Sequence, residues 1–310
     1  MNLEAILYLF LTDVPIQGLI WALFSLGVFI TYRVLNIADL SVEGVFPLSA
    51  ITTLFFINIG IDPFTSILFS IVIGAFIGFI NGLLHIYLKI PSLLSGIIIM
   101  ISLYTVNVLI SKGNITLDTG KETIFSLINN LFNHKVLTQI IVLLFFVVIV
   151  FFVVYWFFGT EYGLSLRAVG KNKTMSKANG ININTRYIIG MVIANIFISL
   201  SGALWGQINK ATAVDSGKGT IVIGLAIVFL GEILIRHKFT FKKSLISIIF
   251  GSLIYWFVMD IIYSIPGFNT NYTFLIQAII ITIIVSIPLI KKIHLKPKKL
   301  IIKETKNDWT

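Results

Sequence analysis

Residues 140–158 read IIVLLFFVVIVFFVVYWFF, a run of 19 residues without a charged side chain. A helix needs roughly 20 largely apolar residues to cross the hydrocarbon core of a bilayer, so this run predicts a transmembrane helix. The whole chain has the same character. Of its 310 residues, 57% are hydrophobic and 12% are charged, about half the charged share of a soluble domain, and the mean hydropathy is +0.99. The sequence therefore indicates a membrane protein whose surface mostly faces lipid.

Apolar runs of this kind, separated by polar or Gly- and Pro-containing stretches, recur along the chain. They predict an all-α membrane protein, a polytopic bundle of about nine transmembrane helices. The range is about eight to ten, because the apolar residues 1–12 can add or remove a crossing. The predicted spans are Pro15–Tyr32, Val45–Ile59, Phe64–Leu88, Leu93–Ile110, Val136–Phe158, Arg186–Gln207, Gly219–Ile235, Phe241–Ile265 and Tyr272–Ile290.

The Lys and Arg residues predict which loops face the cytoplasm. With the N-terminus outside, 18 of the 23 fall in the inner loops and the C-terminal tail, as the positive-inside rule requires. Residues 111–135 are then extracellular and residues 159–185 cytoplasmic. The expected division is an N-terminal segment 1–14, a transmembrane domain 15–290 and a basic cytoplasmic tail 291–310. The first basic residue is Arg33, so the N-terminal run lacks the basic region of a cleaved signal peptide.

Composition excludes several kinds of chemistry. The chain has no cysteine, which removes disulfides, thiol nucleophiles and iron–sulfur ligation. Its four histidines are scattered singly, without the close pairing of a metal site. The net charge of +10 does not indicate nucleic acid, because the basic residues fall in the loops where membrane topology already explains them. We expect no metal and no cofactor in this chain, and no enzymatic activity.

The cytoplasmic loop 159–185 predicts a short helix at Lys173–Ala178. Asn172 suits its N-cap, and Gly180 suits its end because glycine adopts the left-handed conformation without steric cost. Such a helix would lie across the membrane face with Met175 and Ala178 available to fit a groove. The alternative is an ordinary solvated loop whose charges only fix topology.

Polar residues within the apolar pattern are the candidates for a solute pathway or gate. Residues 33–44 carry several of them, and polar groups at membrane depth must contact protein or a water-filled cavity. Asp39 or Glu43 could pair with Arg33; the alternative is an inner loop whose charges are in water. An amide within a span is more often a bond between helices than a ligand contact. The five candidates are Asn36, Asp39, Glu43, Asn107 and Asn195.

Two further patterns concern packing and ion pairing. Gly74, Gly78 and Gly82 repeat at every fourth residue, a spacing that lets helices approach closely in lipid, and we expect them to pack within one subunit. Glu232 lies four residues before Arg236, so the two are expected to form an ion pair along one helix.

Four motifs in order carry a resemblance to a known family. The loop motif is LRAVGKN at 166–172, then Met175, then ANGIN at 178–182. It resembles the cytoplasmic coupling loop of bacterial ABC importer permeases of the branched-chain amino acid and ribose permease superfamily. RVLNIADLSVEGVFPL at 33–48 is similar to the subgroup of tryptophan and tyrosine uptake permeases. Asn195 with LSGALWGQ at 200–207, and GTIVIGLA at 219–226, are also similar. The residues that match the ATPase-coupling loop are Arg167, Gly170, Asn172, Met175, Ala178 and Gly180.

The resemblance implies a type II ABC importer-like permease in the bacterial plasma membrane. Two permease copies would form the pathway, two cytoplasmic ATPase subunits would bind ATP and Mg, and an extracellular lipoprotein would deliver the solute. The chain contains no G-x-x-x-x-G-K-[ST] phosphate loop of its own. The implied solute is an amino acid such as tryptophan or tyrosine. Alternatives are nucleosides or other small solutes handled by the same architecture and, with less support, an ion-coupled secondary transporter.

Overall fold

The computed structural model describes residues 10–132, 134–234, 241–265, 267–269 and 272–294. Nearly all of these residues are helical, which confirms the predicted all-α membrane class. The longer helices are α2 (Asp13–Phe29), α3 (Val42–Asn58), α4 (Pro63–Ile86), α5 (Ser92–Ser111), α7 (Lys135–Gly159), α10 (Ile183–Asn209), α11 (Thr220–Leu234), α12 (Phe241–Tyr263) and α13 (Thr273–His294); the shorter ones are α6 (Ile124–Phe132), α8 (Glu161–Lys171) and α9 (Lys173–Ala178).

Each of the nine predicted spans coincides with a helix. Within the described residues, seven helical stretches are long and apolar enough to cross a membrane. The other two are shorter: α3 has 17 residues, and the apolar part of α13 is 273–286. A helix of 17 residues is roughly 25 Å long, somewhat less than the hydrocarbon core. Residues 1–9 and 295–310, which include most of the N-terminal segment and of the predicted tail, lie outside the described residues.

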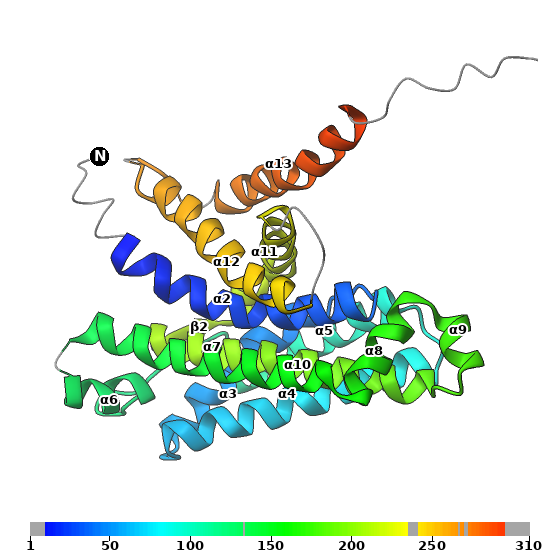
Figure 1. Cartoon of the computed structure of the whole chain (residues 1–310). Coiled ribbons are helices and arrows are strands. Elements are labelled where there is room, and N and C mark those ends of the chain that lie inside the picture. Colours follow the sequence, from blue (N-terminus) through cyan, green and yellow to red (C-terminus); the bar gives the residue numbers. More distant parts are fainter. Residues whose placement is uncertain (1–9, 133, 235–240, 266, 270–271, 295–310) are drawn as a thin grey trace, which may run out of the picture.

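In Figure 1, α2, α4, α7 and α10 run lengthwise across the molecule, and α11, α12 and α13 lie at an angle to them on one side. α10 packs against α4, α3 and α2, and α12 packs against α2 and α11. Most residues of α3 are buried, so this helix contacts other helices and has little surface that can face lipid. α8 and α9 lie at one end of the bundle, and α6 lies at the other. α13 lies at the periphery against α11. We call the two ends the α8–α9 end and the α6 end.

The α4–α10 contact depends on the predicted glycine repeat. A Cβ added to Gly78 would lie 2.6 Å from the Met191 carbonyl oxygen and 3.0 Å from Asn195 Cβ. A Cβ at Gly74 would overlap Ser199, and one at Gly82 would lie 3.0 Å from the Ile188 Cα. All of these partners are on α10 of the same chain, so the expectation of packing within one subunit is confirmed. Backbones that approach this closely gain dispersion contacts that lipid cannot replace.

The helical structure is interrupted between α2 and α3, and we call residues 35–41 the break. α2 continues as a π-helical turn, η1 (Ile30–Val34), which ends where Asn36 takes a φ of +56°. Asparagine is one of the residues that tolerate this left-handed conformation. The next residues have no regular secondary structure and are largely buried until α3 begins at Val42. The break therefore places backbone polar groups inside the protein, where side chains must satisfy them.

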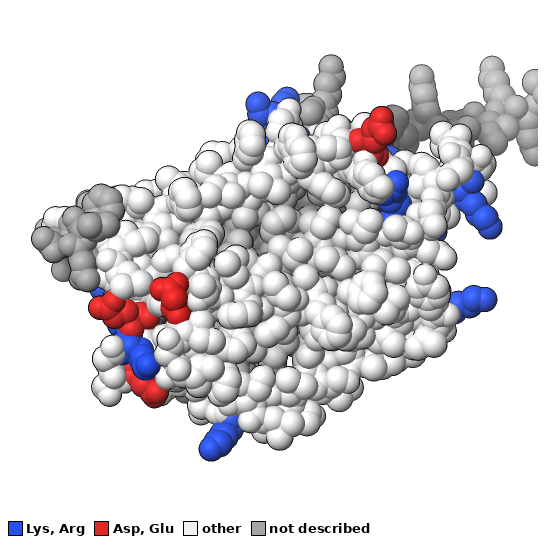
Figure 2. Space-filling model, turned by 90° about the horizontal axis from the view of Figure 1, so that it is seen from below, with Lys and Arg blue, Asp and Glu red and all other residues white. Residues whose placement is uncertain are grey.

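A two-stranded ladder closes the α6 end, which the sequence analysis did not predict. β1 (Asn114–Thr116) pairs antiparallel with β2 (Ala211–Ala213), with Ile115 opposite Thr212. β2 leads into a 3-10 turn, η2 (Val214–Gly217), and then into α11. Across one broad face of the molecule, the Lys, Arg, Asp and Glu side chains lie around the rim and the centre carries none (Figure 2). This distribution suits a surface that contacts lipid in the middle and water at the edges.

Candidate functional site

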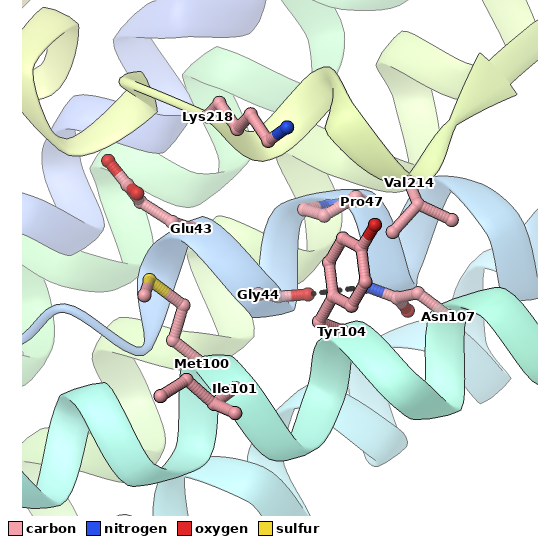
Figure 3. Close-up of a pocket in the computed structure, with 9 residues that line it drawn as sticks. All are labelled: Glu43, Gly44, Pro47, Met100, Ile101, Tyr104, Asn107, Val214 and Lys218. Atoms are coloured by element: carbon pink, nitrogen blue, oxygen red, sulfur yellow. Dashed lines mark hydrogen bonds between the residues drawn. The ribbon is translucent and has the colours of Figure 1, made fainter. Parts of the chain in front are cut away.

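A cavity of about 270 Å³ lies where α3, α5 and the segment from η2 to α11 meet (Figure 3). Met100 and Tyr104 project from α5 toward α3 and toward the segment that carries Lys218. The wall is mostly apolar, with one carboxylate and one ammonium group. It is formed by Glu43, Gly44, Pro47, Met100, Ile101, Tyr104, Asn107, Val214 and Lys218.

One face of α5 supplies much of the wall because of its spacing. Met100, Tyr104 and Asn107 stand at positions i, i+4 and i+7, which share a face of an α-helix. The Asn107 side-chain amide donates to the Gly44 carbonyl at 3.3 Å and so joins α5 to the first turn of α3. Leu103 Cβ would lie 3.0 Å from a Cβ at Gly44, so the two helices approach closely here. Tyr104 and Met100 were not predicted as site residues, although this spacing signals them.

The first turn of α3 also meets the start of α11. Glu43 Oε1 accepts a hydrogen bond from the Gly219 backbone N–H at 3.1 Å. Gly217 approaches the Glu43 carbonyl oxygen so closely that a Cβ there would overlap it. Two helices therefore begin side by side within the protein, and their N-terminal backbone N–H groups give the cavity a positive electrostatic contribution.

Both signs of formal charge are present at this cavity. Glu43 is half-buried on α3, and Lys218 is exposed, with its Nζ 2.9 Å from Asp215 Oδ1. A carboxylate and an ammonium group flanking an aromatic ring and a thioether can bind a zwitterion that carries an apolar side chain. Within the described residues, no three His, Asp or Glu side chains come together as a metal site.

Two of the predicted pathway residues, Asp39 and Asn195, lie elsewhere. Asp39 is 2% exposed, so the alternative of an inner loop with its charges in water does not hold for this residue. Asp39 Oδ1 accepts from the Ser41 N–H and from the Asn81 amide, both at 2.9 Å. Asn195 is buried beside them and donates to the Met191 carbonyl at 3.0 Å. Burial raises the pKa of the Asp39 carboxyl, and the bonds from Ser41 and Asn81 act in the opposite direction.

Arg33 pairs with neither Asp39 nor Glu43, which corrects that expectation. Its Nε lies 2.7 Å from Glu232 Oε1 on α11. Glu232 was expected to pair with Arg236, which lies outside the described residues. The observed pair joins η1 to α11. The fifth pathway candidate, Asn36, is exposed and lines a second cavity at the α8–α9 end, not the one in Figure 3.

The short helix of the loop 159–185 is confirmed with its predicted ends. α9 covers Lys173–Ala178, the Asn172 side chain accepts the Met175 N–H at 3.0 Å, and Gly180 has a φ of +75°. Met175 is 62% exposed, and Ala178 is exposed as well. Together these two present a small apolar surface at the α8–α9 end.

The other two residues assigned to the coupling loop face the protein. Arg167 on α8 donates from Nη2 to the Phe158 carbonyl at 3.0 Å, and its guanidinium lies 5.0 Å from the centre of the Phe241 ring. Gly170 packs against the Val34 carbonyl in η1, where a Cβ would overlap it. α8 is thus tied directly to η1 and through it to the break before α3.

One protein family and several known proteins are similar to this chain over most of its length. Residues 10–285 match the family described as the branched-chain amino acid transport system permease component. A protein of Clostridioides difficile named tyrosine transport system permease protein is 37% identical over 270 residues, which cover 87% of this chain and 88% of the relative.

More distant likenesses extend over similar lengths. The fructose import permease protein of Rhizobium meliloti is 25% identical over 291 residues, 90% of this chain and 76% of the relative. A solved structure of a metal-chelate type ABC transporter in an inward-facing conformation aligns over 93% of this chain and 86% of that chain, with 15% identity and a TM-score of 0.47.

Proposed function

Since the chain belongs to the branched-chain amino acid transport permease family, and is thus an ABC importer permease, we propose that two copies of it form the pathway for an aromatic amino acid such as tryptophan or tyrosine. The observation that carries the proposal is that Glu43, Lys218 and Tyr104 line one cavity at the starts of α3 and α11. The similarity to the tyrosine transport permease of Clostridioides difficile supports the same solute.

The chemistry of the cavity favours a free amino acid. The Glu43 carboxylate attracts an α-ammonium group, and the Lys218 ammonium attracts an α-carboxylate. Tyr104 and Met100 offer an aromatic face and a polarisable thioether to an aromatic side chain. A neutral sugar or nucleoside, the alternative solute class, would offer no ammonium group to the Glu43 carboxylate, whereas the Lys218 ammonium already contacts Asp215. The similarity to the fructose import permease supports that alternative. The alternative is tested by asking whether sugars or nucleosides compete with tyrosine for uptake.

The second copy belongs on the outward face of α5. Beside the cavity this face exposes Ile98, Ile101 and Tyr104, and the cavity opens toward it. A second α5 placed there would close the cavity from its open side and bring two sets of Glu43 and Lys218 together. This is the expected form of a pathway shared by two identical chains.

The α8–α9 end is the ATPase-binding side and faces the cytoplasm. Met175 and Ala178 on α9 form an apolar contact that fits a groove on an ATPase subunit. The contact between Gly170 on α8 and Val34 in η1 transmits a movement of α8 to the break before α3. The α6 end then faces outward, as does the N-terminus, and receives an extracellular substrate-binding lipoprotein. The chain holds no ATP itself. An ion-coupled transporter has less support, because residues 10–285 match an ABC importer permease family.

The test is uptake by the full transporter in proteoliposomes, with the ATPase subunits and the binding protein. Glu43→Gln is expected to raise the Michaelis constant for tyrosine about tenfold or more, since a hydrogen bond to a charged group contributes about 1.5–3 kcal/mol. Glu122→Gln is the matched control, because it makes the same change at an exposed residue far along the chain. Equal Michaelis constants for Glu43→Gln and the control would refute the role of the cavity. Uptake of nucleosides but not tyrosine would refute the solute.

A further inference from the structure

Two neighbouring cavities lie at the α8–α9 end, separate from the proposed pathway. The larger has a volume of about 820 Å³ and lies between η1, α8 and the start of α12. The smaller, of about 570 Å³, lies between the end of α7 and the start of α12. Arg167 and Phe241 line both cavities and form the wall between them.

Basic side chains surround these cavities. Lys171 lines the larger one, Lys242 the smaller one, and Arg167 both. Arg33 also reaches the larger cavity and is paired with Glu232. Among the described residues, neither wall contains an Asp or Glu. The Arg167 Nε has no hydrogen-bond partner, although Nη2 is bonded to the Phe158 carbonyl. The wall between the cavities therefore carries positive charge that no carboxylate on the wall offsets, and it suits a phosphate group.

The smaller cavity has an apolar side that continues onto the lipid-facing surface. It is lined by Tyr155, Trp156 and Phe158 at the end of α7. Trp156 is 64% exposed, and Phe152 one turn earlier is 69% exposed. Tryptophan and tyrosine at the end of an apolar helix mark the boundary between hydrocarbon and water. A ligand that fills this site must therefore present an anion to Arg167 and hydrocarbon to α7.

We propose that this pair of cavities binds an anionic phospholipid, with the head-group phosphate between Lys171, Arg167 and Lys242 and an acyl chain along Phe152 and Trp156. Basic pockets between helices at the membrane boundary recognise such head groups. A free phosphate would share the polar contacts but not the apolar ones. An acidic surface of a protein partner would not need the exposed aromatic side of α7. The lipid would hold α8 against α7 and α12, beside the loop that carries α9.

The test measures lipid binding to the purified full chain by native mass spectrometry. Dioleoyl phosphatidylglycerol is compared with dioleoyl phosphatidylcholine, which has the same chains and no net charge. Phosphatidylglycerol is expected to bind more tightly. The double variant Lys171→Gln/Lys242→Gln is expected to weaken its binding about thirtyfold, since each basic residue near an anionic surface contributes about 1 kcal/mol. The control Lys177→Gln/Lys243→Gln removes the same charge from exposed lysines that line neither cavity, and is expected to bind as the wild type.

Four outcomes would overturn the proposal. Equal binding of the two lipids, or equal losses in the two double variants, would mean that there is no specific head-group site. Full displacement of the lipid by glycerophosphoglycerol, which has the head group and no acyl chains, would assign a phosphate site without a lipid component. Loss of the ATPase subunits from the Lys171→Gln/Lys242→Gln variant, with unchanged lipid binding, would assign the surface to a protein partner.

Discussion

Replacing Gly74 by alanine tests the contact on which the α4–α10 interface depends. An added Cβ would lie 2.6 Å from Ser199 Cβ and 3.0 Å from the Asn195 carbonyl oxygen, and it would overlap Ser199 Oγ. Overpacking of this kind costs about 1–3 kcal/mol, against about 1 kcal/mol gained by replacing glycine with alanine within a helix. We therefore expect Gly74→Ala to destabilise the chain by up to about 2 kcal/mol, since the difference between these two effects is about 0–2 kcal/mol.

A second substitution makes the test specific to this contact. Ser199→Gly removes the overlapping Oγ and Cβ, and Ser199 Oγ has no hydrogen-bond partner to lose. In that background Gly74→Ala is expected to be neutral or stabilising, which gives a coupling of about 2 kcal/mol. Gly159→Ala is the control, because an added Cβ there meets nothing within 4 Å. The assay is unfolding of the purified chain in an SDS titration, followed by tryptophan fluorescence. If Gly74→Ala were as stable as Gly159→Ala, or were not rescued, the packing described here would be wrong.

Three further predictions concern other contacts. Asn172→Ala removes the bond to the Met175 N–H and is expected to destabilise α9 by about 1 kcal/mol; less ATPase should then copurify with the chain. Glu232→Gln is expected to lower the free energy of unfolding by about 1–2 kcal/mol, between the values for exposed and buried ion pairs. The charge swap Arg33→Glu/Glu232→Arg should restore part of this lost stability. Burial raises the pKa of Asp39 above 3.8, so the stability that the protonated carboxyl contributes should be lost as the pH rises above that value. Asp39→Asn should remove this pH dependence, which unfolding curves at several pH values would detect.

Features that depend on neighbouring residues could be predicted from the sequence. The ends of α9 follow from Asn172 and Gly180, whose effects act within one helical turn. The nine apolar segments follow from hydropathy, which averages over about 20 residues. The glycine repeat on α4 predicted close packing, because its period is that of one helix face. It did not say that α10 would be the partner.

Features that depend on distant residues could not be predicted in this way. The ion pair between Glu232 and Arg33 was not predicted, because the fold brings together two residues that lie about 200 positions apart in the sequence. The expected pair of Glu232 with Arg236 stays a prediction, since Arg236 lies outside the described residues. The cavity forms because the start of α11 lies beside the start of α3, and no local sequence pattern predicts that contact. Glu43 and Asn107 were predicted as pathway candidates. The cavity wall also contains Tyr104, which shares a face of α5 with Asn107, and Lys218, which only the tertiary structure assigns to the wall.

The central claim, that the cavity of Glu43 and Tyr104 lies on the solute pathway, is tested most directly by thiol labelling of the assembled transporter. Because the chain contains no cysteine, a single introduced thiol is the only one in the permease. Ile101→Cys lies in the cavity wall, and Val153→Cys on the outward surface of α7 is its control. We predict that a water-soluble maleimide labels residue 101 in the working transporter, that tyrosine slows this labelling, and that labelling blocks uptake. Labelling of residue 101 that is indifferent to tyrosine and leaves uptake intact would contradict the account.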